Sequence, residues 1–269
     1  MMNKTIGFIG CGNMGSAMIG GITASGLCAP AQIIASAHTQ TTLDSISAAY
    51  GIQVTLDNTE VARRADIIFL AVKPYLYQTV IEEIRDITEN DKLIVAIAAG
   101  ISHSRLDSFF GRPAKIIRAM PNTPAMALEA MSALTPNEHV TAEELQMIIT
   151  IFESFGKAEV IPEGLMDTVI GVSGSSPAYV FLFIEAMADA AVADGMPRKQ
   201  AYKFAAQAVY GAAKMVLETG KHPGELKDAV CSPGGTTIEA VARLEETGLR
   251  SAVISAQRRC VEKSKEMGR

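Results

Sequence analysis

The sequence is poor in cysteine and in clustered metal ligands. Its 269 residues include four cysteines and four histidines. No two cysteines have C-x-x-C spacing, and no histidine is spaced as a ligand with another histidine or cysteine. These absences argue against a disulfide framework, and we expect no bound metal. A chain of this size without such a framework is typical of a reducing compartment, so we expect a cytoplasmic protein.

The chain also lacks clustered positive charge and a long uninterrupted apolar run. Its formal net charge is -5, so we expect no nucleic-acid partner. The longest apolar stretch, residues 178–193, is interrupted by Glu185 and Asp189. Its length and charge argue against a membrane span. Because the first strand begins almost at once, we expect no signal peptide. We therefore expect no membrane partner and a helix buried by its own domain or by another subunit.

Apolar runs alternate with helical patterns over the first 162 residues, which predicts an open, doubly wound sheet of the Rossmann type. Beyond residue 162 only helical patterns follow. We therefore expect an α/β domain at 1–162 and an all-helical domain at 163–269, in an α/β protein. The expected strands lie at 6–9, 32–37, 52–54, 66–72, 92–97, 114–120, 130–134 and 158–161.

A glycine loop follows the first strand with the spacing G-x-G-x-x-G. Gly10 permits a tight turn, Gly12 lets a pyrophosphate approach the backbone, and Gly15 allows close packing of the next helix. The N-terminus of that helix attracts phosphate. The loop therefore predicts a dinucleotide site made by Gly10, Cys11, Gly12, Asn13, Met14 and Gly15.

No acidic residue follows the second strand, where NAD-binding domains hold the ribose 2′-hydroxyl. The sequence has Ser36, His38 and Thr39 there, and the first carboxylate is Asp44. Hydroxyl groups and a histidine suit a 2′-phosphate, which favours NADPH, with NADH also usable. A plain polar loop, with the cofactor chosen elsewhere, is the alternative.

Ligands of doubly wound sheets bind outside the carboxyl ends of the strands. The remaining cofactor candidates lie at the carboxyl ends of three further strands. They are Ala71, Val72, Lys73, Pro74, Ala98, Gly100 and Asn122. Asn58 opens a short helix, where it is a plausible N-cap.

Two motifs stand out in the helical half. Ser232 to Thr237 precedes a helix and contains Gly234 and Gly235. Successive N–H groups there can hold a carboxylate, although a loop capped by Thr236 or Thr237 explains it equally well. Glycine and serine residues at 173–176 interrupt an apolar helix, which indicates either a close approach by a ligand or a helix break.

Two other patterns favour structural roles. Tyr210 and Lys214 have the Y-x-x-x-K spacing of short-chain dehydrogenases, but they lie far from the glycine loop. Glu185 and Asp189 share a helix face and suggest an ion pair. No His–carboxylate pair is evident as a general base for alcohol oxidation. Reduction of a protonated imine needs less, since orientation supplies most of the catalysis.

Taken together, the motifs resemble the pyrroline-5-carboxylate reductase family over the whole chain. The matching segments are Ile9–Gly15, Ala71–Pro74, Arg118–Pro124, Gly174–Ala178 and, most specifically, His222–Val241. The resemblance implies reduction of L-1-pyrroline-5-carboxylate to L-proline, the last step of proline biosynthesis. It also implies a helical dimerisation domain, a homodimer and possibly a decamer of five dimers.

The resemblance further implies residue roles. Thr237 would bond the ring nitrogen as the catalytic residue, and Asn58 would contact the adenosine ribose. Ala71, Lys73 and Pro74 would lie near the nicotinamide. The substrate-binding residues would be Ser175, Ser232, Gly234, Gly235, Thr236 and Thr237.

Two alternatives stay open. A β-hydroxyacid dehydrogenase shares the same domain plan but needs a catalytic lysine on the long helix, and residues 173–193 contain none. A non-catalytic sensor would bind NADP without turnover.

Overall fold

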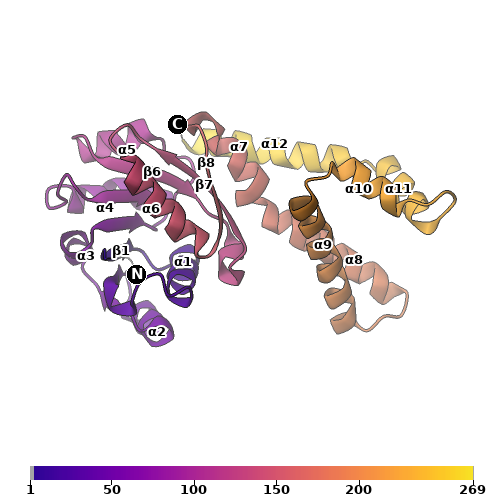
Figure 1. The fold of residues 1–269 in the computed structure, drawn as a ribbon, viewed down its shortest axis with the longest axis horizontal. Helices are drawn as coiled ribbons and strands as arrows, with labels where there is room; N and C mark the ends of the chain where they lie inside the picture. Colours follow the sequence, from indigo (N-terminus) through magenta and orange to yellow (C-terminus); the bar gives the residue numbers. More distant parts are fainter. Residues whose placement is uncertain (1–2, 269) are drawn as a thin grey trace. The chain divides into compact units, whose positions relative to one another are not determined.

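The computed structural model describes residues 3–268, and its first compact unit is built on one mainly parallel sheet (Figure 1). Within the described residues the sheet has eight strands in the order β3-β2-β1-β4-β5-β6-β7-β8. The strands from β1 to β6 are parallel, β7 is antiparallel to β6, and β8 is parallel to β7. Their bounds are β1 Ile6–Ile9, β2 Ile33–Ser36, β3 Gln53–Thr55, β4 Ile67–Leu70, β5 Leu93–Ala96, β6 Lys115–Met120, β7 Ala130–Pro136 and β8 Gly156–Val160.

The strand order from β3 to β6 is the Rossmann order, and every expected strand is present within about two residues of its expected ends. The predicted fold class is therefore confirmed. The chain reverses its direction of winding between β1 and β4. Loops at such a switch point leave a crevice for a ligand.

Helices cover both faces of this sheet. Those of the unit are α1 Asn13–Ala24, α2 Gln40–Tyr50, α3 Asn58–Arg64, α4 Tyr77–Ile84, α5 His103–Phe110, α6 Ala142–Glu153 and α7 Met166–Val169. Side chains of α1, α2 and α6 form one core with alternate strand residues, and those of α3, α4 and α5 form the other. The continuous apolar strands follow from this double burial.

Aromatic rings join the first core. Phe8 and Phe69, from adjacent strands, stack with centroids 4.7 Å apart. Phe152 from α6 packs on Phe69 at 6.1 Å, and Phe155 continues the row at 5.3 Å. These contacts fasten β1 and β4, the two strands that flank the switch point.

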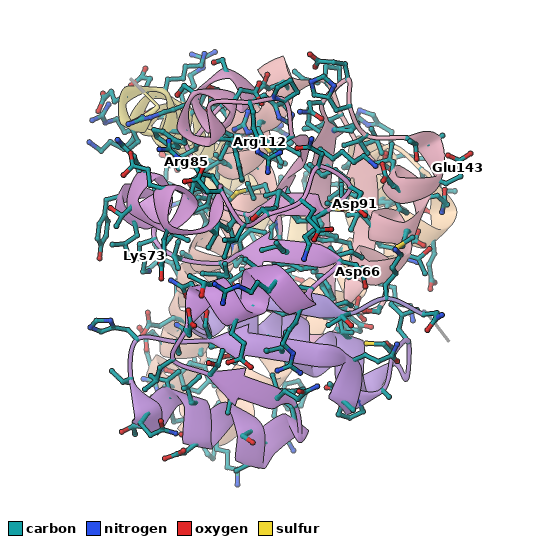
Figure 2. All side chains as sticks on the ribbon, turned by 90° about the vertical axis from the view of Figure 1, so that its left-hand side faces the viewer. Asp66, Lys73, Arg85, Asp91, Arg112 and Glu143 are labelled. Carbon is teal, nitrogen blue, oxygen red and sulfur yellow. The ribbon has the colours of Figure 1, made fainter. Side chains whose placement is uncertain are left out.

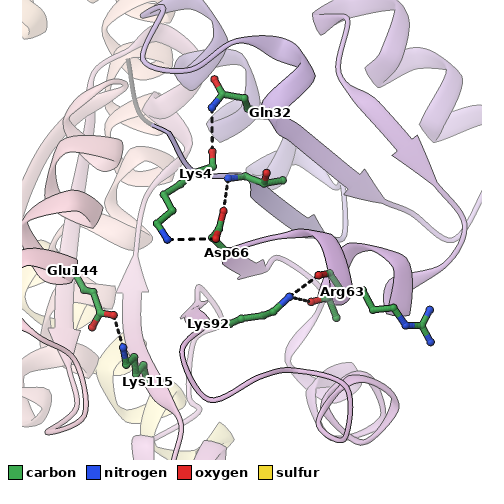
Figure 3. A network of polar contacts seen from close by, with 9 residues as sticks. Lys4, Gln32, Arg63, Asp66, Lys92, Lys115 and Glu144 are labelled. Atoms are coloured by element: carbon green, nitrogen blue, oxygen red, sulfur yellow. Dashed lines mark hydrogen bonds and ion pairs between the residues drawn. The ribbon is translucent and has the colours of Figure 1, made fainter.

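Polar contacts hold the amino edge of the sheet (Figure 3). The Lys4 ammonium lies 3.3 Å from the Asp66 carboxylate, and Lys115 pairs with Glu144 at 2.5 Å. Lys92 donates to two carbonyl oxygens at the end of α3. These contacts therefore stabilise the amino ends of the strands.

The chain after β8 contributes to both compact units. By compactness, the first unit extends to Ser175 and takes back the residues from Cys260 onward, while residues 176–259 form the second unit. Ser264 near the C-terminus donates a hydrogen bond to Asp167 of α7 at 2.5 Å. The expected division at residue 162 stays a prediction about domains, because this compactness follows contacts and not function.

The interruption expected at residues 173–176 has a specific form. Residues Ile170–Gly174 form a π-helix that joins α7 to α8, so the chain stays helical. The Ser175 N–H donates to the Ile170 carbonyl at 2.8 Å and closes this wide turn. Wide turns of this kind occur often at functional sites.

The second unit consists of helices and has little core of its own. Its elements are α8 Ser176–Ala193, α9 Arg198–Thr219, α10 Pro223–Val230, α11 Thr236–Glu246 and the first part of α12 Leu249–Met267. α8 and α9 lie side by side (Figure 1), and the buried side chains of these two helices are alanines. Large apolar residues are exposed: Leu182 at 68%, Phe204 at 68% and Leu217 at 84%. Such a surface indicates an interaction site.

The apolar helix is longer than the run that the sequence marked. The helical stretch Glu163–Ala193 is long and apolar enough to cross a membrane, with 17% of its most apolar window buried. The run marked in the sequence, residues 178–193, is one part of this stretch, and the expectation that it does not span a membrane stays a prediction. Length and composition alone do not distinguish a membrane span from a helix covered by protein.

Candidate functional site

The carboxyl edge of the sheet gathers the sequence-predicted cofactor motifs of the first unit. The motifs follow the ends of β1, β2, β4, β5 and β6, which are neighbours in the sheet. Figure 2 shows Lys73, after β4, on the opposite side of the sheet from Asp66, which precedes β4. The parallel order of the strands therefore places these segments along one edge.

The glycine loop has the geometry that its spacing predicts. Gly10 has a φ of 101°, a left-handed conformation that favours glycine, and a Cβ there would lie 2.8 Å from the Ala71 carbonyl oxygen. A Cβ on Gly15 would lie 2.6 Å from the Gly10 oxygen. At Gly12, by contrast, a Cβ would meet no atom within 4 Å. The loop is thus closed on its protein side and open at Gly12.

The N-terminus of α1 is left without a side-chain cap. Gly12 is the N-cap and offers no side-chain hydrogen bond, and the first turn holds no acidic residue. The first N–H groups of α1 therefore need another acceptor. An uncapped helix N-terminus beside an open glycine fits a pyrophosphate by its geometry and its partial positive charge. The residues present thus fit a dinucleotide.

Cys11 is a buried residue of the glycine loop. Its thiol is buried and donates to the Ser36 carbonyl at 3.4 Å, while Gly10 N–H donates to the same oxygen at 3.0 Å. Burial raises the pKa of Cys11 to about 12, so the thiol stays protonated. These contacts join the ends of β1 and β2.

A cavity of about 450 Å³ runs from Gly12 and Asn13 along α1 to Tyr50.

The segment after β2 divides into buried and exposed parts. The hydroxyl of Ser36 is buried and donates to Asn58 Oδ1 at 2.7 Å. His38 and Thr39 are exposed, and Thr39 caps α2 by accepting from the Thr42 N–H at 3.3 Å. A direct contact of the Ser36 hydroxyl with a 2′-phosphate is disfavoured by its burial, so His38 and Thr39 are the open groups here.

Asn58 does not cap its helix as expected. Asp57 is the N-cap of α3, and its carboxylate accepts from the Thr59 N–H at 2.8 Å. The Asn58 amide instead accepts a hydrogen bond from the Ser36 hydroxyl and donates one to the Glu83 carboxylate of α4. Asp57 was missed because both residues are good caps, and only the backbone conformation decides between them.

A residue that the sequence analysis missed joins two of these segments. Tyr77 of α4 is fully buried. Its hydroxyl donates to the Leu70 carbonyl at the end of β4 and accepts from the N–H groups of Ile97 and Ala98 after β5, at 3.0 and 3.1 Å. Burial raises the pKa of Tyr77 above its usual range, so it keeps this proton. Tyr77 therefore sets the spacing between the segments that begin at Ala71 and Ala98.

Gly100 is less open than its neighbours. It has a φ of 74°, and a Cβ there would lie 3.2 Å from the Cβ of Met267 at the end of α12. The end of the chain therefore covers this residue. Sequence order gave no signal of that contact.

Asn122 has both side-chain groups engaged within the protein. Its Nδ2 donates to the Ser173 carbonyl at 3.0 Å, and its Oδ1 accepts from the Met131 N–H at 3.0 Å. It thereby joins the end of β6 to β7 and to the π-helix. A Cβ on Gly174 would lie 2.9 Å from Met120 Cε, so two predicted motifs meet here. Ser175 accepts a hydrogen bond from the Cys260 thiol at 3.2 Å.

The loop at residues 232–237, in the second unit, repeats the design of the first glycine loop. Gly235 is the N-cap of α11 and offers no side-chain hydrogen bond. Gly234 has a φ of 66°, and a Cβ on Gly235 would lie 2.6 Å from Ser232 Oγ. The alternative that Thr236 or Thr237 caps the helix is therefore wrong. The N–H groups at the start of α11 are free for an anion.

The other candidate pairs have structural partners. Asp189 forms an ion pair with Arg198 at the start of α9, which agrees with the ion-pair interpretation for this residue. Lys214 lies 3.4 Å from Glu218, one turn along α9. Among residues 3–268 no three His, Cys, Asp or Glu side chains are grouped to hold a metal.

Comparison with known proteins agrees with this geometry. Residues 163–267 match the family described as pyrroline-5-carboxylate reductase dimerisation, and residues 5–100 match the family described as NADP oxidoreductase coenzyme F420-dependent. The pyrroline-5-carboxylate reductase of Escherichia coli K12 is 56% identical over 268 residues, covering 100% of both chains. That of Methanosarcina acetivorans is 46% identical over 269 residues, also with 100% coverage of both.

The chain belongs to the pyrroline-5-carboxylate reductase family. The fold agrees with this assignment: a solved Plasmodium falciparum pyrroline carboxylate reductase with NADP bound superposes with a TM-score of 0.91 at 32% identity, covering 100% of both chains. The resemblance seen in the motifs is thus confirmed, as is the class of NAD(P)H-dependent oxidoreductase. The family's dimerisation region includes the exposed apolar helices α8 and α9.

The Tyr77 contacts yield a prediction. Tyr77→Phe removes the hydroxyl that bonds three backbone groups, of which the Ile97 N–H and the Leu70 carbonyl still share a hydrogen bond of 3.4 Å. We expect the free energy of unfolding to fall by about 1–3 kcal/mol. We also expect NADP⁺ to bind several-fold more weakly, because the segments after β4 and β5 lose their shared hydroxyl partner. Denaturant unfolding and calorimetric titration measure the two effects.

Tyr210→Phe is the matched control, since Tyr210 is half exposed on α9. It should change neither quantity. Wild-type stability and affinity in the Tyr77 variant would show that its hydroxyl does not hold the two segments.

Proposed function

We propose that this chain reduces L-1-pyrroline-5-carboxylate to L-proline with NADPH, as the last step of proline biosynthesis. Family membership over the full chain supports the reaction. The observation that carries it in the structure is the pair of uncapped helix N-termini, at Gly12 and at Gly235. The first suits a dinucleotide pyrophosphate, and the second suits the carboxylate of a small substrate.

The residues of the first unit would bind and orient the cofactor. The loop from Gly10 to Gly15 would hold the pyrophosphate through N–H groups, and Asn58 would contact the adenosine ribose. Tyr77 would keep the segments at Ala71–Pro74 and Ala98 in register. When bound, the reduced nicotinamide would supply a hydride.

The residues of the second unit would hold the imine. N–H groups at Ser232–Thr237 would bind its carboxylate, and the Thr237 hydroxyl would bond the ring nitrogen. A protonated C=N carbon accepts a hydride while the nitrogen keeps its proton, so no general base on the protein has to remove one. The absence of a His–carboxylate pair in the sequence agrees with this chemistry.

NADPH is the preferred cofactor in this proposal, with NADH also usable. The family match to an NADP oxidoreductase over residues 5–100 supports NADP. The exposed His38 and Thr39 after β2 are groups that a 2′-phosphate can meet. The sequence has no carboxylate directly at the end of β2 that would exclude the 2′-phosphate.

One assay separates this function from its alternatives. Purified protein should oxidise NADPH when pyrroline-5-carboxylate is added, and it should not reduce NADP⁺ with 3-hydroxy acids. The lysine expected of a β-hydroxyacid dehydrogenase is absent from α8. Turnover with a 3-hydroxy acid alone would favour that class, and NADPH binding without any turnover would favour a sensor.

A substitution tests the second loop. Thr237→Ala removes one hydrogen bond to the reacting ring, worth about 1.5–3 kcal/mol to a charged group, so turnover should fall about 10- to 100-fold. NADPH affinity should stay near that of the wild type. Thr247→Ala, at the other end of α11, removes a hydroxyl bonded only to the helix carbonyls and should keep full activity. A loss of NADPH affinity in Thr237→Ala would place the cofactor at this loop instead.

We further propose that a second copy of the chain covers the apolar helices of the second unit, with no membrane involved and with five dimers able to form a decamer. The dimerisation family spans 163–267 and includes these helices. Their exposed leucine and phenylalanine side chains would be buried between copies.

The assembly has its own test. On a sizing column with light-scattering detection, the protein should elute as a dimer or a larger species without detergent. Phe204→Glu, which places a charge on the exposed face of α9, should shift it toward smaller or aggregated species. A fully active monomer would contradict the proposed assembly.

A further inference from the structure

The end of β2 lacks the acidic residue that usually decides between NAD and NADP. In NAD-binding Rossmann domains a carboxylate there accepts from the ribose 2′-hydroxyl and leaves no place for a 2′-phosphate. Here β2 ends at Ser36 and the next carboxylate along the chain is Asp44, inside α2. Asp44 accepts a hydrogen bond from Gln40 of its own helix at 2.8 Å.

The carboxylate of Glu83, on α4, is nevertheless linked to the end of β2 by hydrogen bonds. The Ser36 hydroxyl donates to Asn58 Oδ1 at 2.7 Å, and Asn58 Nδ2 donates to Glu83 Oε2 at 2.8 Å. The three side chains come from the end of β2, the start of α3 and the last turn of α4. One amide group therefore separates the Glu83 carboxylate from the last residue of β2.

The two hydrogen bonds also fix which way the Asn58 amide points. Ser36 can donate only to the amide oxygen, and an ionised Glu83 can accept only from the amide nitrogen. The second hydrogen on Asn58 Nδ2 stays available to a ligand. Ser36 and Glu83 thus orient Asn58 together.

The charge of Glu83 is not neutralised by a neighbour. Its side chain is exposed, and no lysine or arginine among residues 3–268 forms an ion pair with it. On the neighbouring helix, by contrast, Glu60 is paired with Arg64 at 2.7 Å. A negative potential therefore remains at the edge where the adenosine ribose of a Rossmann cofactor lies.

We propose that Glu83 is a specificity-determining residue that disfavours the cofactor 2′-phosphate and so narrows the preference of this site for NADP over NAD. It takes the place of the acidic residue missing after β2, from the helix that follows β4. This inference rests on the proposed function, since it needs a dinucleotide bound at the glycine loop.

Like charges within a Debye length of about 10 Å repel each other measurably at moderate salt. Two hydrogen bonds, of 2.7 and 2.8 Å, and one amide group separate the Ser36 hydroxyl from the Glu83 carboxylate, and this separation is shorter than the Debye length. Removal of the carboxylate should therefore strengthen NADP⁺ binding about three- to tenfold. NAD⁺ has no 2′-phosphate and should be affected less than about twofold by the same change.

Calorimetric titration of the full-length protein with NADP⁺ and with NAD⁺ tests this proposal. Glu83→Gln keeps an oxygen that accepts from Asn58 and removes only the charge. Glu82→Gln is the matched control, because Glu82 is an exposed neighbour on α4 that bonds to Gln78. We expect the ratio of the two dissociation constants to shift toward NADP⁺ only in Glu83→Gln, and the shift to shrink at high salt.

Three results would overturn it. An equal change for both dinucleotides would show that Glu83 only positions Asn58. An unchanged ratio would show that its charge does not reach the 2′-phosphate. Failure of the wild-type protein to bind either dinucleotide would refute the proposed function itself, which the titrations distinguish from the first two results.

Discussion

The cofactor edge depends on one backbone contact. The Ala71 N–H donates to the Ile9 carbonyl at 2.8 Å, where β1 and β4 end side by side. This contact brings the glycine loop against the segment after β4 so closely that Gly10 has no room for a side chain. The tight turn at Gly10 places the start of α1 at the carboxyl edge of the sheet. The stacked Phe8 and Phe69 hold the same two strands from within the core, so packing and site geometry share one origin.

Shared backbone acceptors and one buried hydroxyl extend this arrangement to the neighbouring strands. The Ser36 carbonyl accepts from both Gly10 N–H and Cys11 Sγ, which ties the end of β2 to the loop. Tyr77 does the same for β4 and β5. The cofactor edge is therefore preorganised by groups that need not touch a ligand. A buried polar network of this kind stabilises the fold when every member has its hydrogen-bond partner.

The two units illustrate two ways of burying apolar surface. The first has a core on each face of its sheet, while the second exposes large apolar side chains around a few buried alanines. A helical unit of this kind is incomplete as a single copy. Residues 163–267 match a dimerisation family, and the proposed association of two copies would supply the missing core.

Local pattern was enough for much of this protein. The strand order of a Rossmann sheet, the uncapped loop at Gly12 and the family follow from apolar periodicity, glycine spacing and short motifs, since each is written in neighbouring residues. Contacts between distant residues were not readable in this way. Glu83 meets Asn58, Met267 covers Gly100 and Tyr77 joins two strand ends only because the fold brings separate elements together. No local pattern records such pairings, so the groups that tune the site emerged only from tertiary structure.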